Sequence, residues 1–407
     1  MGRKTDEGHT GMKYFLAPLG CQMNKSDAER IRTVLDKAGL VETDHEEEAS
    51  LLGLVACSVR QKSINRVYGR IEKWNQWKRK KNVITFVSGC ILPADEGNFL
   101  KLFDLVFKID DLPRLPRMIR QYGIVTPFSQ APESDLEGNE EASQEFWKIK
   151  PKYSSVFQAY VPIQNGCNKF CSFCAVPYTR GREVSRPSSE ILAEVSDLLE
   201  NGCKTITLLG QNVNSYGMDR EEEMSFARLL QEIGELGKRS RKEFWLYYTS
   251  PHPSDMTREV FEVMAIYPCL ARHLHLPIQS GDDTILKRMN RSYSMERFRH
   301  IVRDVREVLP EATLFTDIIV GFSGETREQF QHTLDALREF QFDMAYIAQY
   351  SPRPGAASYE WPDDVPTEEK KKRYEELTQE LRKVGLLCNQ RRMGKVCRAL
   401  VEGMDRK

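Results

Sequence analysis

The sequence predicts an α/β protein of more than one domain, and three observations support this. Apolar stretches typical of strands alternate with helical patterns along most of the chain. The chain has 407 residues, which is too long for one ordinary compact core. A polar, acidic stretch with two prolines interrupts the alternation. We therefore expect an N-terminal domain over 12–125, a linker over 126–150, a larger domain over 151–385 and a C-terminal segment over 386–407.

The composition excludes several classes of protein. Apolar residues make up 40% of the sequence, enough for globular cores, and the formal net charge is zero, so contacts with nucleic acid must come from local basic patches. No apolar run approaches the ~20 residues that cross a membrane, and the first residues do not resemble a signal peptide. Ten cysteines without a secretion signal indicate a reducing compartment, the cytoplasm, and metal or catalytic use.

The N-terminal domain is expected to hold a parallel sheet. Its apolar stretches predict four strands, at 13–21, 50–58, 82–90 and 102–110. The first helix is expected to begin at a capping box made by Ser26 and Glu29 and to end at Gly39. The second helix has one apolar face, made by Ile64, Val67, Tyr68, Ile71 and Trp74. Strands separated by helices predict parallel pairing with right-handed crossovers.

The larger domain repeats the strand–helix unit six times. The predicted strands lie at 159–166, 205–213, 243–250, 272–280, 313–322 and 344–352. Six units are too few for a closed eight-stranded barrel. They predict an open, partial (βα)6 barrel with a cleft at the carboxyl ends of its strands. A charged helix follows, and the last stretch, 391–407, begins like another strand.

Three cysteines stand close together after the first barrel strand. Cys167, Cys171 and Cys174 lie within nine positions, in the loop where such folds place their chemistry. A structural zinc site needs a fourth ligand, and none lies nearby in the sequence. Three buried structural cysteines are a poor fit to such close spacing in a loop. Three thiolates can instead hold three irons of a [4Fe-4S] cluster and leave the fourth iron open.

A second set of cysteines is predicted by topology and not by spacing. Cys21, Cys57 and Cys90 each end a predicted strand and each follow a small residue, namely Gly20, Ala56 and Gly89. Parallel strands bring their carboxyl ends to one edge of the sheet, so the three thiols should converge there. Three buried core cysteines remain the alternative. We expect a second three-cysteine [4Fe-4S] cluster. The other cysteines, Cys203, Cys269, Cys388 and Cys397, are expected to be core or surface thiols. His252, His273 and His275 are expected to be packing or hydrogen-bonding residues.

The spacing of Cys167, Cys171 and Cys174 resembles the signature of radical S-adenosylmethionine (SAM) enzymes. The resemblance implies that SAM binds the open iron through its amino and carboxylate groups, and that Phe173 packs near the SAM adenine. Polar residues at the barrel strand ends are then candidates for further SAM contacts: Gly210, Gln211, Asn212, Ser250, Gln279, Ser280 and Asp317. The superfamily often has Gly-Glu where this chain has Gly210-Gln211. Arg180 and Arg182 are candidates to pair with a carboxylate or phosphate, and surface salt bridges explain them equally well.

Several longer stretches resemble the methylthiotransferase family of radical SAM enzymes over roughly residues 12–395. They include LGCQMNKSDAE, VACSVRQK, GCNKFCSFCAVPYTRGREVSRP, LLGQNVNSYG and HLPIQSGDDTILKRMNR. The resemblance implies two [4Fe-4S] clusters and two uses of SAM, one as methyl donor to sulfur and one as radical source. It also implies transfer of a 2-methylthio group to N6-prenylated adenosine next to the anticodon. Family members usually continue into a small RNA-binding β-domain, expected here only as a stub over 386–407.

The resemblance further implies the partners: the tRNA anticodon stem-loop and an electron donor such as flavodoxin or ferredoxin. We expect a monomer without membrane contact. Two neighbouring activities stay open, methylthio transfer to a ribosomal-protein aspartate and to threonylcarbamoyladenosine in tRNA. A non-enzymatic iron–sulfur scaffold or electron carrier is the third alternative, although it would not need a barrel with a SAM signature.

Overall fold

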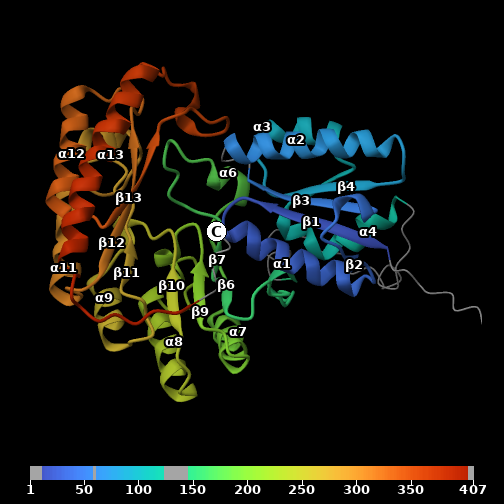
Figure 1. Ribbon diagram of the computed structural model, residues 1–407, viewed down its shortest axis with the longest axis horizontal. Helices are drawn as coiled ribbons and strands as arrows, with labels where there is room; N and C mark the ends of the chain where they lie inside the picture. Colours follow the sequence, from blue (N-terminus) through green and yellow to red (C-terminus); the bar gives the residue numbers. More distant parts are fainter. Residues whose placement is uncertain (1–11, 58–60, 123–144, 402–407) are drawn as a thin grey trace, which may run out of the picture. The chain divides into compact units, whose positions relative to one another are not determined.

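The computed structural model describes residues 12–57, 61–122 and 145–401, and its chain divides into two compact units, Met1–Ser154 and Ser155–Lys407. Each unit has its own sheet or sheets, which Figure 1 shows with their labels. In the described residues, no helix has the length and apolar character needed to span a membrane.

The first unit contains the predicted parallel sheet, with five strands in the order β2-β1-β3-β4-β5. Their bounds are β1 Lys13–Leu19, β2 Val41–Glu42, β3 Leu51–Cys57, β4 Ile84–Cys90 and β5 Leu105–Val106. The prediction is thus confirmed for β1, β3 and β4. It missed β2, and the fourth predicted strand shrinks to the two residues of β5. Strands this short form no apolar pattern that a sequence window can detect.

Helices cover both faces of this sheet. They are α1 Gln22–Lys37, α2 Gln61–Lys78, α3 Pro93–Leu102 and α4 Leu115–Arg120, with 3₁₀ turns at Glu46–Glu48 and Ile109–Arg114. In Figure 1, α2 and α3 lie over one face and α1 and α4 over the other. Strand β1 contributes side chains to the hydrophobic cores on both faces of the sheet. Tyr14 and Leu16 pack with α1, while Ala17 and Leu19 pack with α2. The alternation of side chains along a strand explains this division.

The predicted start of α1 is wrong by one helical turn. Cys21 is the N-cap, and the amide oxygen of Asn24, in the third helical position, accepts the Cys21 N–H at 3.2 Å. Ser26 and Glu29 lie inside the helix and are buried, and Ser26 Oγ accepts a hydrogen bond from Arg30 at 2.9 Å. The helix ends as predicted at Gly39, whose φ of +84° suits a residue without Cβ.

The predicted linker over 126–150 falls mostly outside the described residues, which resume at 145. Its last six residues belong to the first unit, where Phe146 and Trp147 are buried in the core beside α1. The guanidinium of Arg30 lies 5.4 Å from the Phe146 ring centroid. This contact explains why polar residues of α1 are buried: the chain at 145–150 covers them.

The second unit contains the six predicted parallel strands. They are β6 Gln158–Pro162, β9 Thr205–Leu209, β10 Trp245–Tyr248, β11 His273–His275, β12 Thr313–Val320 and β13 Met344–Gln349. They form two sheets, ordered β10-β9-β6 and β11-β12-β13, and a parallel bridge from Leu246 to Leu270 continues the order between them. The prediction of an open six-stranded partial barrel is confirmed.

The connections of this barrel include eight α-helices within the described residues. They are α6 Val176–Arg180, α7 Ser188–Glu200, α8 Phe226–Ser240, α9 Arg258–Ile266, α10 Asp283–Arg288, α11 Met295–Val308, α12 Arg327–Phe340 and α13 Thr367–Gln390. A small antiparallel pair, β7 Gln164–Asn165 and β8 Val184–Ser185, follows β6 and precedes α7. Three 3₁₀ turns lie at Val213–Ser215, Pro253–Asp255 and Ala357–Glu360.

The C-terminal stretch differs from its prediction. Helix α13 continues to Gln390, past the expected boundary at 386, and the described residues 391–401 form no strand. A single strand needs a partner for its backbone hydrogen bonds, and the stretch has none in the described residues. Ion pairs tie it to the barrel instead, from Lys395 to Glu311 at 3.2 Å and from Arg398 to Glu243 at 3.2 Å.

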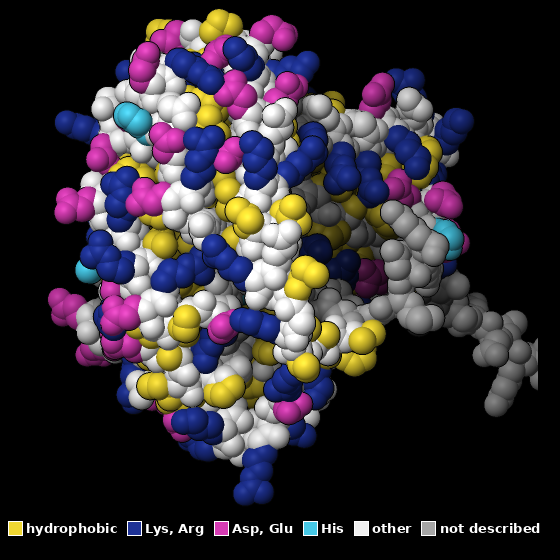
Figure 2. All heavy atoms as spheres, turned by 60° about the vertical axis from the view of Figure 1, so that its left-hand side comes forward, with side chains coloured by type: hydrophobic (Ala, Val, Ile, Leu, Met, Phe, Trp, Pro, Cys, Tyr) yellow, Lys and Arg dark blue, Asp and Glu magenta, His cyan; other side chains and the backbone are white. Residues whose placement is uncertain are grey.

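The surface carries both signs of charge. On the face drawn in Figure 2, Lys and Arg side chains are interspersed with Asp and Glu side chains, in keeping with the zero formal net charge. Any RNA contact must therefore depend on local groups, because phosphate binding by a broad basic field needs an excess of cations.

Candidate functional site

Three cysteines of the first unit meet at the carboxyl edge of its sheet. The register of β3 and β4 pairs Cys57 with Cys90 directly. Leu19 at the end of β1 pairs with Ala56, so Cys21, two residues further, reaches the same edge. Cys57 and Cys90 are buried and Cys21 is half-buried. Topology alone brings together three residues that are more than 30 positions apart.

The side chain of Asn24 lies among these three chain segments. Its Nδ2 donates to the carbonyl oxygen of Ala56 at 3.1 Å, and its Oδ1 accepts from the Cys21 N–H. A Cβ on Gly20 would lie 2.0 Å from Asn24 Oδ1, and one on Gly89 would lie 3.0 Å from Nδ2. Gly89 also has a φ of +106°. Only residues without a Cβ fit here, so the glycines before Cys21 and Cys90 are required by close packing.

The loop of the second unit is held at both ends. The N–H of Cys167 donates to the carbonyl oxygen of Gly181 at 3.2 Å, and the N–H of Cys174 donates to that of Cys171 at 2.9 Å. Gly166 has a φ of +81°, and a Cβ there would lie 2.0 Å from the carbonyl oxygen of Arg182. The loop therefore packs backbone to backbone against residues 181–182.

The three thiols of this loop interact electrostatically. Burial raises the pKa of the Cys167 thiol to about 11, and the neighbouring Cys171 adds to the rise. Burial raises the pKa of the Cys174 thiol to about 12, with Cys171 and Cys167 contributing. Such thiols ionise readily only when a metal takes up their charge.

The chemistry of the donor set fits an iron–sulfur cluster. In the described part of the chain, no three His, Cys, Asp or Glu side chains are arranged to hold one metal ion. Soft thiolate ligands alone, as in the loop, are the set that such clusters use.

A buried arginine faces the loop. Arg291 Nη1 lies 3.4 Å from Cys171 Sγ, and its Nη2 donates to the carbonyl oxygen of Pro277 at 3.0 Å. Arg291 is 9% exposed. A fixed positive charge here offsets the negative charge that ionised thiols would bring into a buried site.

Polar residues at the strand ends bind the loop and one another. Gln211 Oε1, after β9, accepts from the N–H of Gly166 at 2.6 Å. Asn212 Nδ2 donates to Asp255 at 2.8 Å, and Lys169 in the loop pairs with Asp255 at 2.6 Å. The amide of Gln211 is thus occupied within the protein. The role of Gln211 as a SAM contact stays a prediction.

Four buried polar atoms at successive strand ends have no hydrogen-bond partner among the described residues: Gln164 Oε1, Asn212 Oδ1, His252 Nε2 and Gln279 Oε1. They follow β6, β9, β10 and β11 respectively. The pKa of His252 is lowered to about 2, first by burial, so this ring is neutral. Buried polar groups in folded proteins nearly always find partners, so these atoms indicate a polar ligand.

The other predicted SAM contacts differ in their surroundings. Phe173 is half-buried and its ring lies 6.5 Å from that of Phe322, edge to face. Asp317 Oδ2 accepts a hydrogen bond from His275 Nε2 at 2.9 Å on the adjacent strand, and Ser250 is exposed with a φ of +57°. His275, expected to be a packing or hydrogen-bonding residue, is thus the hydrogen-bond partner of a candidate site residue.

Gly210, Ser280 and the two arginines complete the predicted set. A Cβ on Gly210 would lie 3.0 Å from Gln164 Oε1, so its small size allows a close approach. Ser280 is fully buried, Arg180 is buried, and Arg182 is exposed. The two arginines thus have different environments despite being two residues apart.

Sequence reasoning missed four residues of these sites: Asn24, Gln164, Glu183 and Arg291. Glu183 is buried against Ser215, and burial raises its pKa. Asn24 carried a usable signal, because it stands three residues after a cysteine at the start of a helix. The partners of Gln164, Glu183 and Arg291 are distant in the sequence, so no spacing pattern could reveal them.

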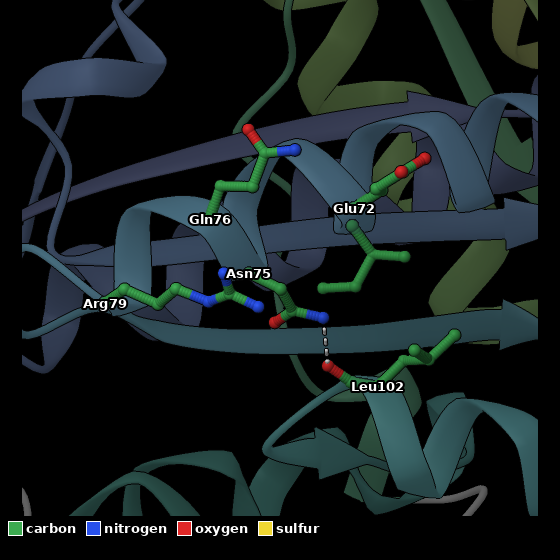
Figure 3. A pocket seen from close by; sticks show the side chains of 6 residues that line it. Glu72, Asn75, Gln76, Arg79 and Leu102 are labelled. Carbon is green, nitrogen blue, oxygen red and sulfur yellow. Dashed lines mark hydrogen bonds between the residues drawn. The ribbon is translucent and has the colours of Figure 1, made fainter.

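A surface pocket of the first unit lies away from these sites. Figure 3 shows it between α2 and α3, with Asn75 donating to the carbonyl oxygen of Leu102 at 3.2 Å. Asp104, two residues beyond Leu102, binds the backbone N–H of Thr85 at the start of β4. The pocket is therefore at the edge of the sheet opposite the three cysteines.

Comparisons with known proteins agree with this organisation. Residues 161–337 match the Radical SAM superfamily, and residues 13–108 match Uncharacterized protein family UPF0004. The chain is 38% identical over 403 residues to a tRNA-2-methylthio-N(6)-dimethylallyladenosine synthase of Neisseria gonorrhoeae, covering 97% of this chain and 89% of that protein. It is 39% identical over 400 residues to a protein of the same name from Acidothermus cellulolyticus, covering 97% and 78%.

Among solved structures, the radical S-adenosylmethionine methyltransferase TsrM from Kitasatospora setae is similar, with a TM-score of 0.62 and 14% identity over 86% of this chain and 75% of that chain. At this identity the likeness concerns the fold. The likeness in sequence to the synthases extends over nearly the whole chain. The protein belongs to the methylthiotransferase family of radical SAM enzymes.

Proposed function

We propose that the protein is a tRNA methylthiotransferase that adds a 2-methylthio group to N6-prenylated adenosine next to the anticodon. The observation that carries this is the 38% identity over 97% of the chain to synthases named for this product. These names favour the prenyladenosine over a ribosomal-protein aspartate or threonylcarbamoyladenosine. A scaffold or electron carrier would not explain a radical SAM barrel with polar strand ends.

Membership of the radical SAM family implies a [4Fe-4S] cluster and SAM. We propose Cys167, Cys171 and Cys174 as the ligands of that cluster, with SAM as the source of a deoxyadenosyl radical when both are bound. Gly166 and Gly181 fix the loop, and Arg291 balances its charge. The buried polar atoms of Gln164, Asn212, His252 and Gln279 are suited to bind the polar groups of SAM in place of water.

We propose a second [4Fe-4S] cluster at Cys21, Cys57 and Cys90. Their common sheet edge supports this, as do the glycines that let three chain segments approach one another. These three residues would hold the cluster, which would supply the sulfur chemistry of the methylthio transfer when bound. Asn24 and the backbone around it would keep the three thiols in place.

The electron donor, the oligomeric state and the location in the cell are also proposals. Reduction of the radical cluster needs an electron donor, for which flavodoxin or ferredoxin is suited. We expect a monomer acting on the anticodon stem-loop in the cytoplasm.

The test uses tRNA from a strain lacking this gene. Mass spectrometry of its nucleosides should show prenylated adenosine without the methylthio group, and the gene on a plasmid should restore the modification. The purified protein, reduced anaerobically with SAM, should release deoxyadenosine. Unchanged methylthio-adenosine in the deletion strain, with loss of a modified ribosomal protein instead, would contradict the proposal.

A further inference from the structure

We propose that Phe170, Tyr178 and Arg182 form a stacking site for a nucleobase of the substrate RNA. This inference rests on the proposed function, because it takes RNA as the substrate. We call the three side chains the Phe170 platform.

The three side chains are already in contact. The Phe170 and Tyr178 ring centroids lie 6.3 Å apart at 79°, an edge-to-face arrangement. The guanidinium carbon of Arg182 lies 4.4 Å from the Phe170 ring centroid. Tyr178 is 46% exposed and Arg182 is exposed, while Phe170 is half-buried. The platform thus presents aromatic and cationic surface to solvent.

The backbone of Phe170 is strained to hold this position. Its φ is +48°, a left-handed conformation that is unusual for a bulky aromatic residue. Asn290 Nδ2 fixes the turn by donating to the carbonyl oxygens of Phe170 at 2.8 Å and Lys169 at 3.3 Å. Complete burial of the ring would offset the strain, but the ring stays half-exposed. Strain of this kind is concentrated at functional sites.

The platform is part of the cysteine loop. Phe170 directly precedes Cys171, and Tyr178 lies on α6, which begins two residues after Cys174. The turn that carries Arg182 packs against Gly166 and accepts the hydrogen bond of Cys167 through Gly181. A base on the platform would therefore lie next to the proposed radical cluster, where a target adenosine or its neighbour must be.

The chemistry of the platform suits a nucleobase. Aromatic rings and arginine planes are the surfaces on which proteins stack single-stranded bases. A chain with zero net charge gains little from general attraction to phosphate, so stacking should carry a large share of the affinity. An aspartate side chain in a ribosomal protein has no π face and would gain nothing from Phe170.

The test measures binding of an anticodon stem-loop RNA to the full chain by fluorescence anisotropy, with 2-aminopurine next to the anticodon as a second probe. Tyr178→Ala and Phe170→Leu should each weaken binding about ten-fold. Tyr178→Phe keeps the ring and should bind like the wild type. Arg182→Gln should also lower the dependence of binding on salt by about one ion.

The matched control is Tyr374→Ala, which removes a 37% exposed tyrosine on α13 and should bind like the wild type. The 2-aminopurine should be quenched by wild type and less by Tyr178→Ala. Equal binding and quenching by all variants would overturn the platform and leave the proposed function standing. If the wild type itself does not bind this RNA, the proposed function fails. If the platform variants bind the RNA normally but lose binding to a ribosomal-protein peptide, the surface belongs to a protein substrate, and this result also overturns the platform.

Discussion

Asn24 is a single residue that contacts the chain beside all three cysteines of the first unit. It hydrogen-bonds the backbone of Cys21 and of Ala56, and it fills the space left by Gly20 and Gly89. Its side chain is fully buried, so each bond is made away from competing water. The hydrogen bonds of the sheet hold the strands together only up to their last residues. Asn24 thus sets the distance between the chain segments beyond the strand ends, which carry the cysteines.

We predict that Asn24→Ala weakens iron binding by the first unit. The variant loses two hydrogen bonds worth about 1 kcal/mol each and leaves the Ala56 carbonyl oxygen without its donor. The measurement is iron per chain and the electron paramagnetic resonance spectrum, in a background with Cys167, Cys171 and Cys174 replaced by alanine. Iron should fall clearly below the ~4 per chain of that background.

Asn24→Asp separates position from charge. It keeps the acceptor for Cys21 but loses the donor to Ala56 and adds a negative charge near the thiolates, so the reduction potential of the cluster should fall. Thr85→Val is the control, since Thr85 is equally buried and bonds Asp104 at the opposite edge of the sheet. Full iron and an unchanged spectrum in Asn24→Ala would show that the residue does not position the cysteines.

Residues of these sites were predictable from the sequence where the ligands of one site stand close together in the chain. Cys167, Cys171 and Cys174 are three donors within nine positions, so the sequence alone indicates a cluster loop. Arg291 contacts Cys171 from 120 positions away, and nothing in its own neighbourhood marks it. The first turn of α1 was misassigned because Ser26 and Glu29 match a capping pattern, while burial by residues 145–154 decides their actual role.

Helix α13 shows the same limit at the scale of an element. Its sequence predicts a charged helix and does not mark any charged residue as buried, yet Lys370 and Arg373 are buried. Arg373 Nη1 lies 2.8 Å from Glu325 Oε2, and the Lys370 stem covers Gly321, where a Cβ would lie 2.4 Å from Lys370 Cγ. Ion pairs and alkyl stems therefore anchor α13, in addition to a few apolar residues such as Leu377.

We predict that Arg373→Met lowers the free energy of unfolding by about 3–5 kcal/mol at neutral pH, because Glu325 would remain as a buried, unpaired carboxylate. Lys383→Met is the matched control: Lys383 is on the same helix, pairs with Glu380 and is 72% exposed, so its loss should cost under about 1 kcal/mol. Chemical denaturation measures both. A loss for Arg373→Met no larger than that of the control would contradict the prediction.

The pH dependence gives a second check on the Arg373→Met variant. Burial already raises the pKa of Glu325 with its partner present, and loss of Arg373 should raise it further. A carboxyl group whose pKa is raised by folding keeps its proton to a higher pH in the folded state than in the unfolded state. The stability deficit of the variant relative to the wild type should therefore be smallest below the unfolded pKa of about 4.3 and grow as pH rises through the folded pKa. A deficit that grows on acidification would exclude this explanation.

At the scale of the whole molecule, the alternation of strands and helices was sufficient to predict the parallel sheet of the first unit and the six barrel strands of the second. Five of the six barrel strands form within the stretches predicted for them, and β6 begins one residue earlier, at Gln158, since six similar units repeat the same local signals. The two-residue strand β2, the short length of β5 and the path of residues 391–401 were not predictable, because tertiary contacts alone define them. The two cysteine sets belong to different compact units, each with its own sheets.

This division predicts that the two iron sites can be separated by mutation. Cys57→Ala should still release deoxyadenosine from SAM, because the proposed radical cluster depends on the loop of the second unit. The same variant should form no methylthio product on tRNA, since the sulfur-bearing site would lack one of its three ligands. Iron should fall from ~8 toward ~4 per chain.

Cys397→Ser is the control: this exposed cysteine lies outside both sets, so iron, deoxyadenosine and product should match the wild type. Product formed by Cys57→Ala would remove the second cluster from the reaction, whereas loss of all iron would show that the two units do not hold their clusters independently.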